Sequence, residues 1–492
     1  MLQDHNNSTI CAPATASGSG AISIVRVSGQ EAIEIVSKIF VSAKGRSLAD
    51  MKGYTMCYGT IVGPDAQVLD DVVLGVYRSP ESYTGEDMVE ISSHASPYIV
   101  SELLDLLVES GCSFASSGEF TKRAFLNGKM DLAQAEAVAD VIASETEASH
   151  RIAMQQLKGG FSEELAKMRR QLLHLVSLME LELDFSEEEV EFADRAELKN
   201  LLDITTSHIS ELVSSFKLGN AIKNGVPVAI VGATNTGKST LLNALLGEDR
   251  AIVSSIAGTT RDTIEDTMNV GGILFRFIDT AGIRRTLETI EIAGIERTYF
   301  KIKQAAIVML VLDYTRQGDF EESIKNLSNN LGDNDQKIVI LLNKIDEKPL
   351  VATNLFDDRG PQAAAPEENI ASVCETISNL ATAAGLAPIA ILPICAKNLT
   401  GLEELRAVLV SSQSNMSSAG GALLVSNRRH FTALKEAYEA LLKASVALTE
   451  NRPGDLVAQD IRDALYSLGT IVGEISTDEV LENIFKSFCI GK

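Results

Sequence analysis

The chain has 492 residues, enough for two or three domains with cores of their own, and 45% of its residues are hydrophobic. No apolar run approaches the roughly 18 residues of a membrane span, and residues 1–8 lack the basic start of a signal peptide. The formal net charge of −24 argues against nucleic-acid binding by bulk charge, and six cysteines without paired spacing indicate reduced thiols and no metal site. We therefore expect a soluble, cytoplasmic protein in which any RNA meets a local basic patch or a second protein.

The first 127 residues predict a mixed α/β domain. Alternation and helical spacing indicate, in order, a strand, a helix and two strands, at 21–27, 31–40, 72–77 and 88–91. A polar turn, 82–87, separates the last two strands. Arg26 and Glu90 lie on two of these strands. The pattern alone gives no reason to prefer a contact with a ligand over an ion pair between them on the surface.

A helical region begins near Asp131. Residues 131–134 resemble a capping box, and the alanine-rich residues 135–143 have high helix propensity. Helical patterns recur over 154–183. The acidic run 187–191 is most simply a solvated face or a helix end.

A phosphate-binding loop follows. Apolar residues 226–231 predict a strand, 240–246 predict a helix, and Gly-Ala-Thr-Asn-Thr-Gly-Lys-Ser stands between them at 232–239. The glycines let backbone N–H groups turn inward around a polyphosphate, and the helix N-terminus adds a positive end. Lys238 would reach the terminal phosphates, and Ser239 would hold Mg²⁺. The alternative is a glycine-rich turn before a core helix.

Further pieces arrive in the order that a GTPase needs. Residues 273–278 predict a strand that ends at Asp279-Thr280-Ala281-Gly282, where Asp279 can contact Mg²⁺ through water and Gly282 can offer its N–H to the γ-phosphate. Ile283 stands where Ras-like switches have a glutamine that orients water, and an apolar side chain cannot do so. Catalysis therefore needs another group.

Base selection is predicted after a second buried strand, 337–342, which ends at Asn343-Lys344-Ile345-Asp346. Asp346 can accept two hydrogen bonds from guanine, and adenine cannot supply them, so the wrong base leaves a buried acceptor unpaired. A last strand, 389–394, is followed by the loop Cys395-Ala396-Lys397, which can lie against the guanine base. These patterns together indicate guanine nucleotide binding.

Helical patterns resume at 428–448 and 456–468, so the nucleotide-binding module, about 220–412, is predicted to be inserted into a helical domain. The expected fold class is multidomain, α/β and α: an N-terminal α+β domain, then a helical domain with an inserted Ras-like P-loop GTPase domain. Nucleotide state could then move the two helical parts relative to each other.

The chain resembles the MnmE (TrmE) family of tRNA-modification GTPases. The motifs that carry the resemblance span the chain in family order: Ser17-Gly-Ser-Gly-Ala-Ile22, Tyr83-Thr-Gly-Glu-Asp87, residues 118–129, Asp131-Leu-Ala-Gln-Ala-Glu-Ala137, Ile256-Ala-Gly-Thr-Thr-Arg-Asp262, Gly294-Ile-Glu-Arg297 and Cys489-Ile-Gly-Lys492.

The resemblance implies four segments: a tetrahydrofolate-binding and dimerisation domain (1–127), the first helical part (128–219), the G domain (220–412) and the second helical part with its C-terminal tail (413–492). It implies a homodimer that hydrolyses GTP and works with the FAD protein MnmG in a heterotetramer or larger complex. Together they place an aminomethyl or carboxymethylaminomethyl group on carbon 5 of the wobble uridine of certain tRNAs. The one-carbon unit comes from 5-formyl- or methylene-tetrahydrofolate.

The resemblance also assigns ions and roles in the G domain. A K⁺ ion would be bound by Asn235, Ser254, Ile256 and Thr259. It would occupy the position of an arginine finger, a group that accelerates GTP hydrolysis by roughly 10³- to 10⁵-fold. Thr260 would complete Mg²⁺ coordination with Ser239. The expected catalytic residues are Lys238, Cys489 and Glu291. Of these, Glu291 would orient the attacking water through a second water. The alternative is that Glu291 is an ordinary exposed glutamate at a helix start. The expected GTP-binding residues are Asn235, Thr236, Gly237, Lys238, Ser239, Thr240, Ser254, Ser255, Ile256, Ala257, Gly258, Thr259, Thr260, Asp279, Thr280, Ala281, Gly282, Asn343, Lys344, Asp346, Cys395, Ala396 and Lys397.

The C-terminal tail reaches the folate site in the family, and its cysteine, here Cys489, is needed for tRNA modification and not for GTP hydrolysis. From the residues alone, the alternative to a functional Cys489 is a buried structural thiol, since apolar side chains precede it. The ending fits a prenylation box poorly. The folate contacts correspond to Arg26, Glu90, Lys129 and Lys492.

Several positions depart from the family pattern. His94-Ala-Ser-Pro97 replaces His-Gly-Gly, Cys395 and Ser254 replace a serine and a threonine, and 349–370 is predicted to be an exposed insertion. Two other function classes stay open: a ribosome-assembly or signalling GTPase without folate chemistry, and a non-catalytic scaffold that binds GTP.

Overall fold

The computed structural model describes residues 8–16, 18, 20–184, 195–247, 266–278, 302–332, 336–347, 370–413, 423–450, 452–486 and 488–491. The chain forms two compact units. The first comprises residues 1–143, 153–214 and 429–492, and the second comprises 144–152 and 215–428. Within the described residues, no helix combines the length and the apolar character that crossing a bilayer requires.

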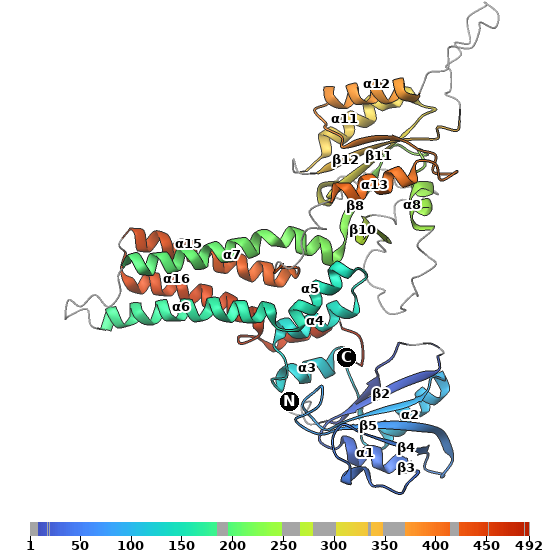
Figure 1. Ribbon diagram of the computed structural model, residues 1–492, viewed down its shortest axis with the longest axis vertical. Coiled ribbons are helices and arrows are strands. Elements are labelled where there is room, and N and C mark those ends of the chain that lie inside the picture. Colours follow the sequence, from blue (N-terminus) through green and yellow to red (C-terminus); the bar gives the residue numbers. More distant parts are fainter. Residues whose placement is uncertain are drawn as a thin grey trace, which may run out of the picture. The chain divides into compact units, whose positions relative to one another are not determined.

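The N-terminal part of the first unit is a seven-stranded sheet in the order β3-β4-β5-β6-β2-β1-β7. Figure 1 shows this sheet with β2, β3, β4 and β5 labelled. Neighbouring strands are antiparallel apart from β1 and β7. The strands are β1 Ile10–Pro13, β2 Ile22–Ser28, β3 Phe40–Ser42, β4 Thr55–Val62, β5 Val68–Tyr77, β6 Met88–His94 and β7 Ser113–Phe114.

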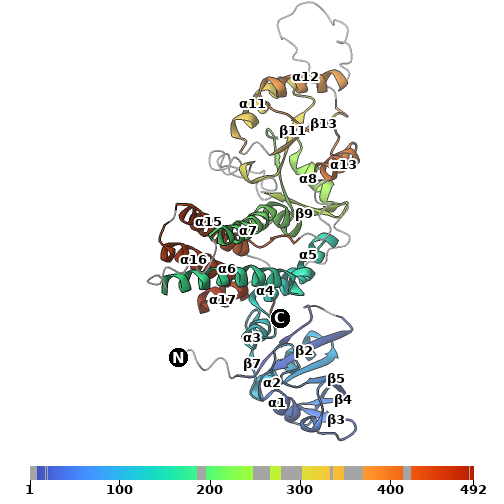
Figure 2. The ribbon, with the colours of Figure 1, turned by 60° about the vertical axis from the view of Figure 1, so that its left-hand side comes forward.

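Two helices, α1 (Ala32–Ile39) and α2 (Pro97–Glu109), pack side by side on one face of this sheet (Figure 2). Strand alternation places the apolar side chains of β2, β4, β5 and β6 beneath them, which makes one continuous core. Pro97 occupies the first turn of α2, where the N–H that proline lacks has no partner within the helix. The departure at 94–97 therefore connects β6, which ends at His94, to α2, which begins at Pro97.

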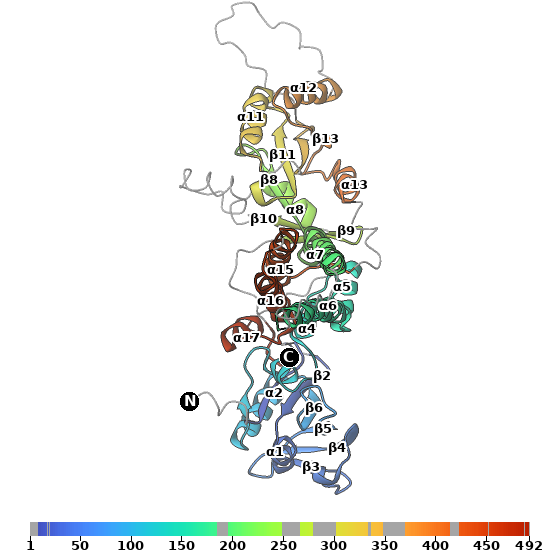
Figure 3. The same ribbon diagram turned by 90° about the vertical axis from the view of Figure 1, so that its left-hand side faces the viewer.

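The helical part of the first unit contains a bundle in which α6, α15, α16 and the first part of α7 run side by side, seen along their axes in Figure 3. Its core consists of small and aliphatic side chains, among them Leu165, Leu172, Leu441 and Leu468. The helices that lie wholly or partly in this part are α3 Glu119–Leu126, α4 Leu132–Ile142, α5 Glu147–Leu157, α6 Gly160–Asp184, α7 Arg195–Asn224, α15 Arg428–Thr449, α16 Gly454–Val472 and α17 Asp478–Phe485. Of these, α5 and α7 are divided between the two units.

The second unit is a six-stranded sheet in the order β13-β12-β11-β8-β10-β9, parallel except for the pair β9 and β10. Helices α8 and α13 cover one face, and α11 and α12 cover the other. The elements are β8 Val226–Val231, α8 Lys238–Gly247, β9 Asp266–Val270, β10 Ile273–Ile278, β11 Ile307–Asp313, α11 Phe320–Asn330, β12 Lys337–Asn343, α12 Ile370–Ala383, β13 Ala390–Pro393 and α13 Leu402–Ser412.

A doubly wound sheet of this kind binds ligands at the carboxyl ends of its strands, where the strand order reverses. The reversal occurs at β8, between β10 and β11. The predicted strands 226–231 and 273–278 match β8 and β10 residue for residue. The fold class expected from the sequence, α/β and α with a P-loop GTPase-like unit, is confirmed.

Candidate nucleotide site

The loop between β8 and α8 has the shape of a phosphate cradle. Gly232, Asn235 and Gly237 have φ angles of +148°, +63° and +99°. A Cβ atom at Gly232 would lie 2.3 Å from the carbonyl oxygen of Val311, and one at Gly237 would lie 2.2 Å from Nδ2 of Asn343. Both glycines are therefore required by the fold, because the loop turns tightly against the ends of two neighbouring strands.

Lys238 begins α8 and folds back over this loop. Its Nζ donates to the carbonyl oxygens of Gly232 and Ala233, at 2.9 and 2.6 Å, and Thr236 Oγ1 donates to Ala233 at 3.0 Å. Burial lowers the pKa of Lys238. A partly desolvated ammonium at the N-terminus of a helix is suited to the charge of a polyphosphate, so the loop fits the group that the sequence predicts.

Asn343, the last residue of β12, joins the phosphate loop to the loop after β13. Its Nδ2 donates to the Thr236 carbonyl at 2.8 Å, and its Oδ1 accepts from the backbone N–H of Ala396 at 3.0 Å. The side chain is buried. Three segments that are far apart in the sequence, at 236, 343 and 396, thus meet around one amide.

The base-binding segment continues from Asn343. Asp346 is exposed, and Asn398 Nδ2 donates to its carboxylate at 3.4 Å. Cys395 is buried and exchanges two backbone hydrogen bonds with Thr400, of 3.0 and 3.1 Å, which close the loop that contains Ala396 and Lys397. A cysteine at 395 therefore leaves this loop folded, and burial raises the pKa of its thiol.

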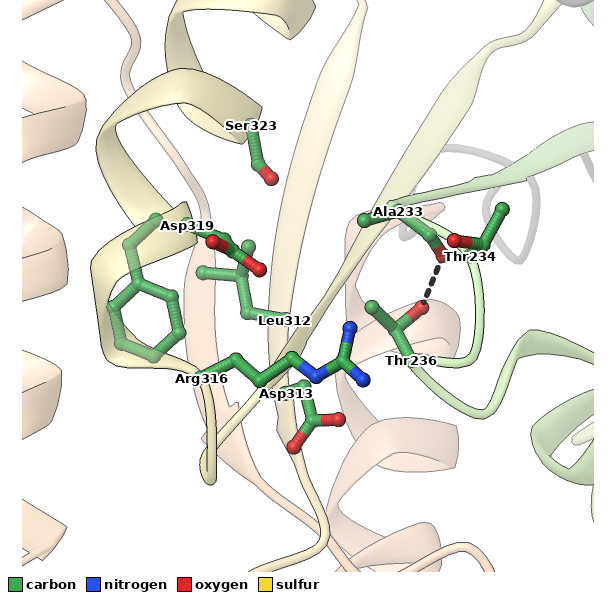
Figure 4. A pocket seen from close by; sticks show the side chains of 9 residues that line it. Ala233, Thr234, Thr236, Leu312, Asp313, Arg316, Asp319 and Ser323 are labelled. Carbon is green, nitrogen blue, oxygen red and sulfur yellow. Dashed lines mark hydrogen bonds between the residues drawn. The ribbon is translucent and has the colours of Figure 1, made fainter. Parts of the chain in front are cut away.

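Sequence reasoning missed Asp313, at the end of β11. Its carboxylate lies 2.6 Å from Nζ of Lys344. Figure 4 shows Asp313 with Arg316 and Thr236 in a pocket beside the phosphate loop. The signal that was available is a carboxylate directly after an unbroken apolar run, 307–312.

Part of the predicted site lies outside the described residues: Ser254, Ser255, Ile256, Ala257, Gly258, Thr259, Thr260, Asp279, Thr280, Ala281, Gly282, Glu291 and Lys492, as well as Ile283, the acidic run 187–191 and positions 349–369. Ser239 and Thr240 lie in the first turn of α8. The structure thus brings together the phosphate loop, Asn343 to Asp346 and the loop at 395–397.

Arg26 and Glu90 are adjacent on β2 and β6 of the first unit. Arg26 Nη2 and Nε lie 2.7 and 3.1 Å from Oε1 of Glu90, and Tyr77 donates to Oε2 at 3.3 Å. The guanidinium also lies over the rings of Tyr83 and Phe120, 5.2 and 5.7 Å from their centroids. The pair is half-buried and held on several sides, so an ordinary surface pair is a poor description.

The C-terminal tail lies beside this pair. Ile490 forms a bridge with Ser117, and the Gly491 carbonyl accepts from Arg26 Nη1 at 3.5 Å. Cys489 is exposed, so the interpretation of this thiol as buried was wrong: the apolar Phe485 and Phe488 turn into the core and leave it outside. Lys129 is exposed and donates to the Pro80 carbonyl at 2.9 Å.

Comparison with known proteins decides the family. The protein-family model for the MnmE helical domain matches residues 132–489. The family model for the GTP-binding protein TrmE N-terminus matches residues 9–129. The chain belongs to the MnmE family. This confirms the family and the class of enzyme, a GTPase of tRNA modification, that the sequence motifs predict.

Two MnmE relatives illustrate the match. The tRNA modification GTPase MnmE of Parabacteroides distasonis is 49% identical over 99% of this chain and 100% of its own length. That of Bacteroides thetaiotaomicron is 48% identical over the same shares. A solved GTP-binding protein of Sulfolobus solfataricus, in complex with GDP, is 18% identical with a TM-score of 0.28, over 55% of this chain and 79% of that one, and adds nothing to the assignment.

Proposed function

We propose that this chain binds and hydrolyses GTP and uses a tetrahydrofolate to modify carbon 5 of the wobble uridine of certain tRNAs, together with MnmG. The main support for GTP binding is the side chain of Asn343, whose hydrogen bonds connect the phosphate loop to the loop at Ala396. The segment that would bind the base and the loop that would bind the phosphates are thereby fixed relative to each other before any nucleotide binds, which lowers the cost of ordering them on binding.

The residues of this site would have distinct roles in binding the phosphates, Mg²⁺ and guanine. The backbone N–H groups of 235–240 and the Lys238 ammonium would hold the phosphates, while Ser239 with Thr260 would hold Mg²⁺ and Asp279 would support it through water. Mg²⁺ neutralises charge that develops on the phosphates. Asp346 would accept the guanine N–H groups, and the strong penalty for an unpaired carboxylate would exclude adenine.

Catalysis requires groups other than a switch glutamine, because Ile283 occupies that position. We assign the orientation of the attacking water to Glu291. Asn235, with its left-handed backbone, is exposed at the edge of the phosphate loop, where its side chain would bind K⁺ together with Ser254, Ile256 and Thr259. K⁺ supplies positive charge to the transition state, as an arginine finger does in other GTPases.

The folate site is assigned to Arg26, Glu90, Lys129 and Lys492. The N–H groups of a pterin pair with a carboxylate, and the glutamyl carboxylates of a folate pair with cations, so the donor set matches the ligand. Arg26 and Glu90 are already positioned by Tyr77, Tyr83 and Phe120. Cys489 is exposed on a tail that contacts Arg26 through Gly491, which supports a role in modification.

The assembly is assigned as a homodimer formed by the N-terminal domains, bound to the FAD protein MnmG and acting in the cytoplasm. The sheet face opposite α1 and α2 carries exposed apolar side chains on β4 and β5: Met56 is 78% exposed, Tyr58 56% and Val73 37%. Such a patch supports a protein interface. The net charge of −24 supports the view that a partner protein helps to hold the tRNA.

Reconstitution with MnmG, tRNA, GTP and a tetrahydrofolate donor tests the proposal, with mass spectrometry of the wobble nucleoside and release of phosphate as the two readouts. The wild-type chain is expected to give both. Lys238→Ala should lose both, and Cys489→Ser should lose only modification. GTP hydrolysis by the wild type without folate binding or modification would contradict the proposal and indicate a switch GTPase.

A further inference from the structure

Asp313 is a buried carboxylate whose two oxygens have separate partners. It ends β11 directly opposite Asn343, the last residue of β12. Oδ1 accepts from the backbone N–H and the hydroxyl of Thr315, at 2.9 and 2.6 Å. Oδ2 lies 2.6 Å from Nζ of Lys344, and the carboxylate side chain is only 3% exposed.

The charge on Asp313 is maintained by these partners. Burial raises the pKa of its carboxyl, but the hydrogen bonds from Lys344 and Thr315 outweigh burial and hold the pKa below its ordinary value. Because Thr315 fixes one oxygen, the other is aimed at Lys344 and cannot rotate away without losing two hydrogen bonds. A charge-assisted hydrogen bond in this position is among the stronger polar contacts in proteins.

Lys344 is fixed at both ends. Its φ of +64° is a backbone conformation that non-glycine residues rarely adopt, and it follows Asn343, which is anchored to Thr236 and Ala396. At the other end, the ammonium is held by Asp313. The four-carbon stem therefore spans between two fixed points, whereas an unpaired lysine samples many rotamers.

We propose that Asp313 is a positioning residue for guanine nucleotide binding, which holds Lys344 in its binding conformation before the nucleotide arrives. This inference rests on the proposed function of the unit as a GTP site. Asp313 does not contact the nucleotide; it acts through Lys344 by removing the cost of ordering a long side chain on binding. That cost corresponds to a loss of up to about tenfold in affinity for one immobilised side chain.

The expected effect of Asp313→Asn is a dissociation of GDP that is up to about tenfold faster, since changes within one site act mainly on dissociation. The turnover number at saturating GTP should stay unchanged while KM rises. Inosine diphosphate, which lacks the guanine amino group, should lose affinity by the same factor as GDP. Asp346→Asn should instead reduce the preference for GDP, because it removes the acceptor for that amino group.

The experiment measures dissociation of fluorescent GDP and inosine diphosphate analogues from the full-length chain. Asp319→Asn is the matched control, because Asp319 is exposed and lines the same pocket (Figure 4). It should leave both rates unchanged. Thermal melting establishes that the variants are folded, and Asp313→Glu, which keeps the charge but shifts it by one methylene, replaces Asp313→Asn if that variant does not fold.

A double-mutant cycle with Lys344→Met identifies the route of the effect. If Asp313 acts through Lys344, Asp313→Asn causes no further loss in the Lys344→Met background. Unchanged dissociation in Asp313→Asn, or a loss that persists in full without the lysine ammonium, would overturn the inference. A wild-type chain that binds neither nucleotide would instead overturn the proposed function.

Discussion

Glu136 is a carboxylate that is buried among helices and fully paired. Its Oε1 and Oε2 each accept from Arg429 at 2.9 Å, and Oε2 lies 2.6 Å from Nε2 of His430. Arg429 also donates to the carbonyls of Thr470 and Ile471, which lie in the last turn of α16 and need donors from outside the helix. This cluster links α4, α15 and α16, and removal of one charge leaves the others buried without their partner.

Glu136→Gln should destabilise the first unit by about 3 kcal/mol at pH 7, the size expected when one partner of a buried ion pair is removed. Its matched control is Glu439→Gln on α15, whose carboxylate is 3.8 Å from Lys435 with both side chains largely exposed. That variant should unfold like the wild type. Urea unfolding of both variants measures the difference, and equal midpoints for Glu136→Gln and wild type would show that the cluster adds no stability.

The same cluster predicts a pH dependence. Burial raises the pKa of Glu136, but His430 and Arg429 outweigh burial and lower the pKa to about 2. A lowered pKa in the folded state means that the stabilisation is complete above the unfolded pKa of about 4.5 and is lost as the pH falls toward 2. The gap between wild type and Glu136→Gln should therefore shrink between pH 5 and about pH 3.

At the residue scale, the sequence predicts the phosphate loop and Asn343 because these motifs are contiguous and their order is diagnostic. It could not predict the pairing of Asp313 with Lys344, which depends on the parallel register of β11 and β12. Likewise, Glu136 and Arg429 are 293 positions apart and meet only through packing of the helices. Contacts set by tertiary structure leave no local pattern in a single sequence.

At the scale of elements, the capping box at the start of α4 shows how local chemistry was predictable. Asp131 accepts from the N–H of Gln134 at 2.8 Å, and Gln134 Oε1 accepts from the N–H of Asp131 at 3.0 Å. Two N–H groups that the helix leaves without partners are thus satisfied. Because every partner lies within four residues, the sequence spacing alone predicts the contact.

Asp131→Ala should cost about 1 kcal/mol of stability in the first unit, since alanine cannot cap α4. Asp131→Ser is the matched control, because its hydroxyl accepts the same hydrogen bond and should retain most of the stability. Thermal melting compares the three proteins. Equal melting temperatures for Asp131→Ala and wild type would mean that the cap does not stabilise α4.

Elements without a distinctive motif were less predictable. β11 is an apolar run, 307–312, that periodicity alone cannot distinguish from part of a buried helix. The structure buries all of it between β8 and β12. β1, β3 and β7 have four residues or fewer, too short for a period-2 pattern to be recognised.

For the whole molecule, the two units are connected through helices. The chain enters the second unit at Ser144 and returns within α5, at Ala153; it leaves the first unit again within α7, after Ser214, and returns for the last time at the start of α15, at Arg429. Arg429 is also the residue that pairs with Glu136, so the return point is anchored in the core of the first unit. The second unit is therefore an insertion whose last junction with the first unit lies at a buried ion-pair cluster.

The most direct test of the central claim is the rate of nucleotide hydrolysis by the purified chain in KCl and in NaCl at equal ionic strength, with GTP and ATP side by side. GTP hydrolysis should be much faster in KCl, by up to about 10³-fold, the lower range for a charge at the arginine-finger position, and ATP should be inert. Equal rates of GTP hydrolysis in the two salts would contradict the K⁺ site around Asn235. Comparable hydrolysis of ATP would contradict the guanine site at Asn343 to Asp346.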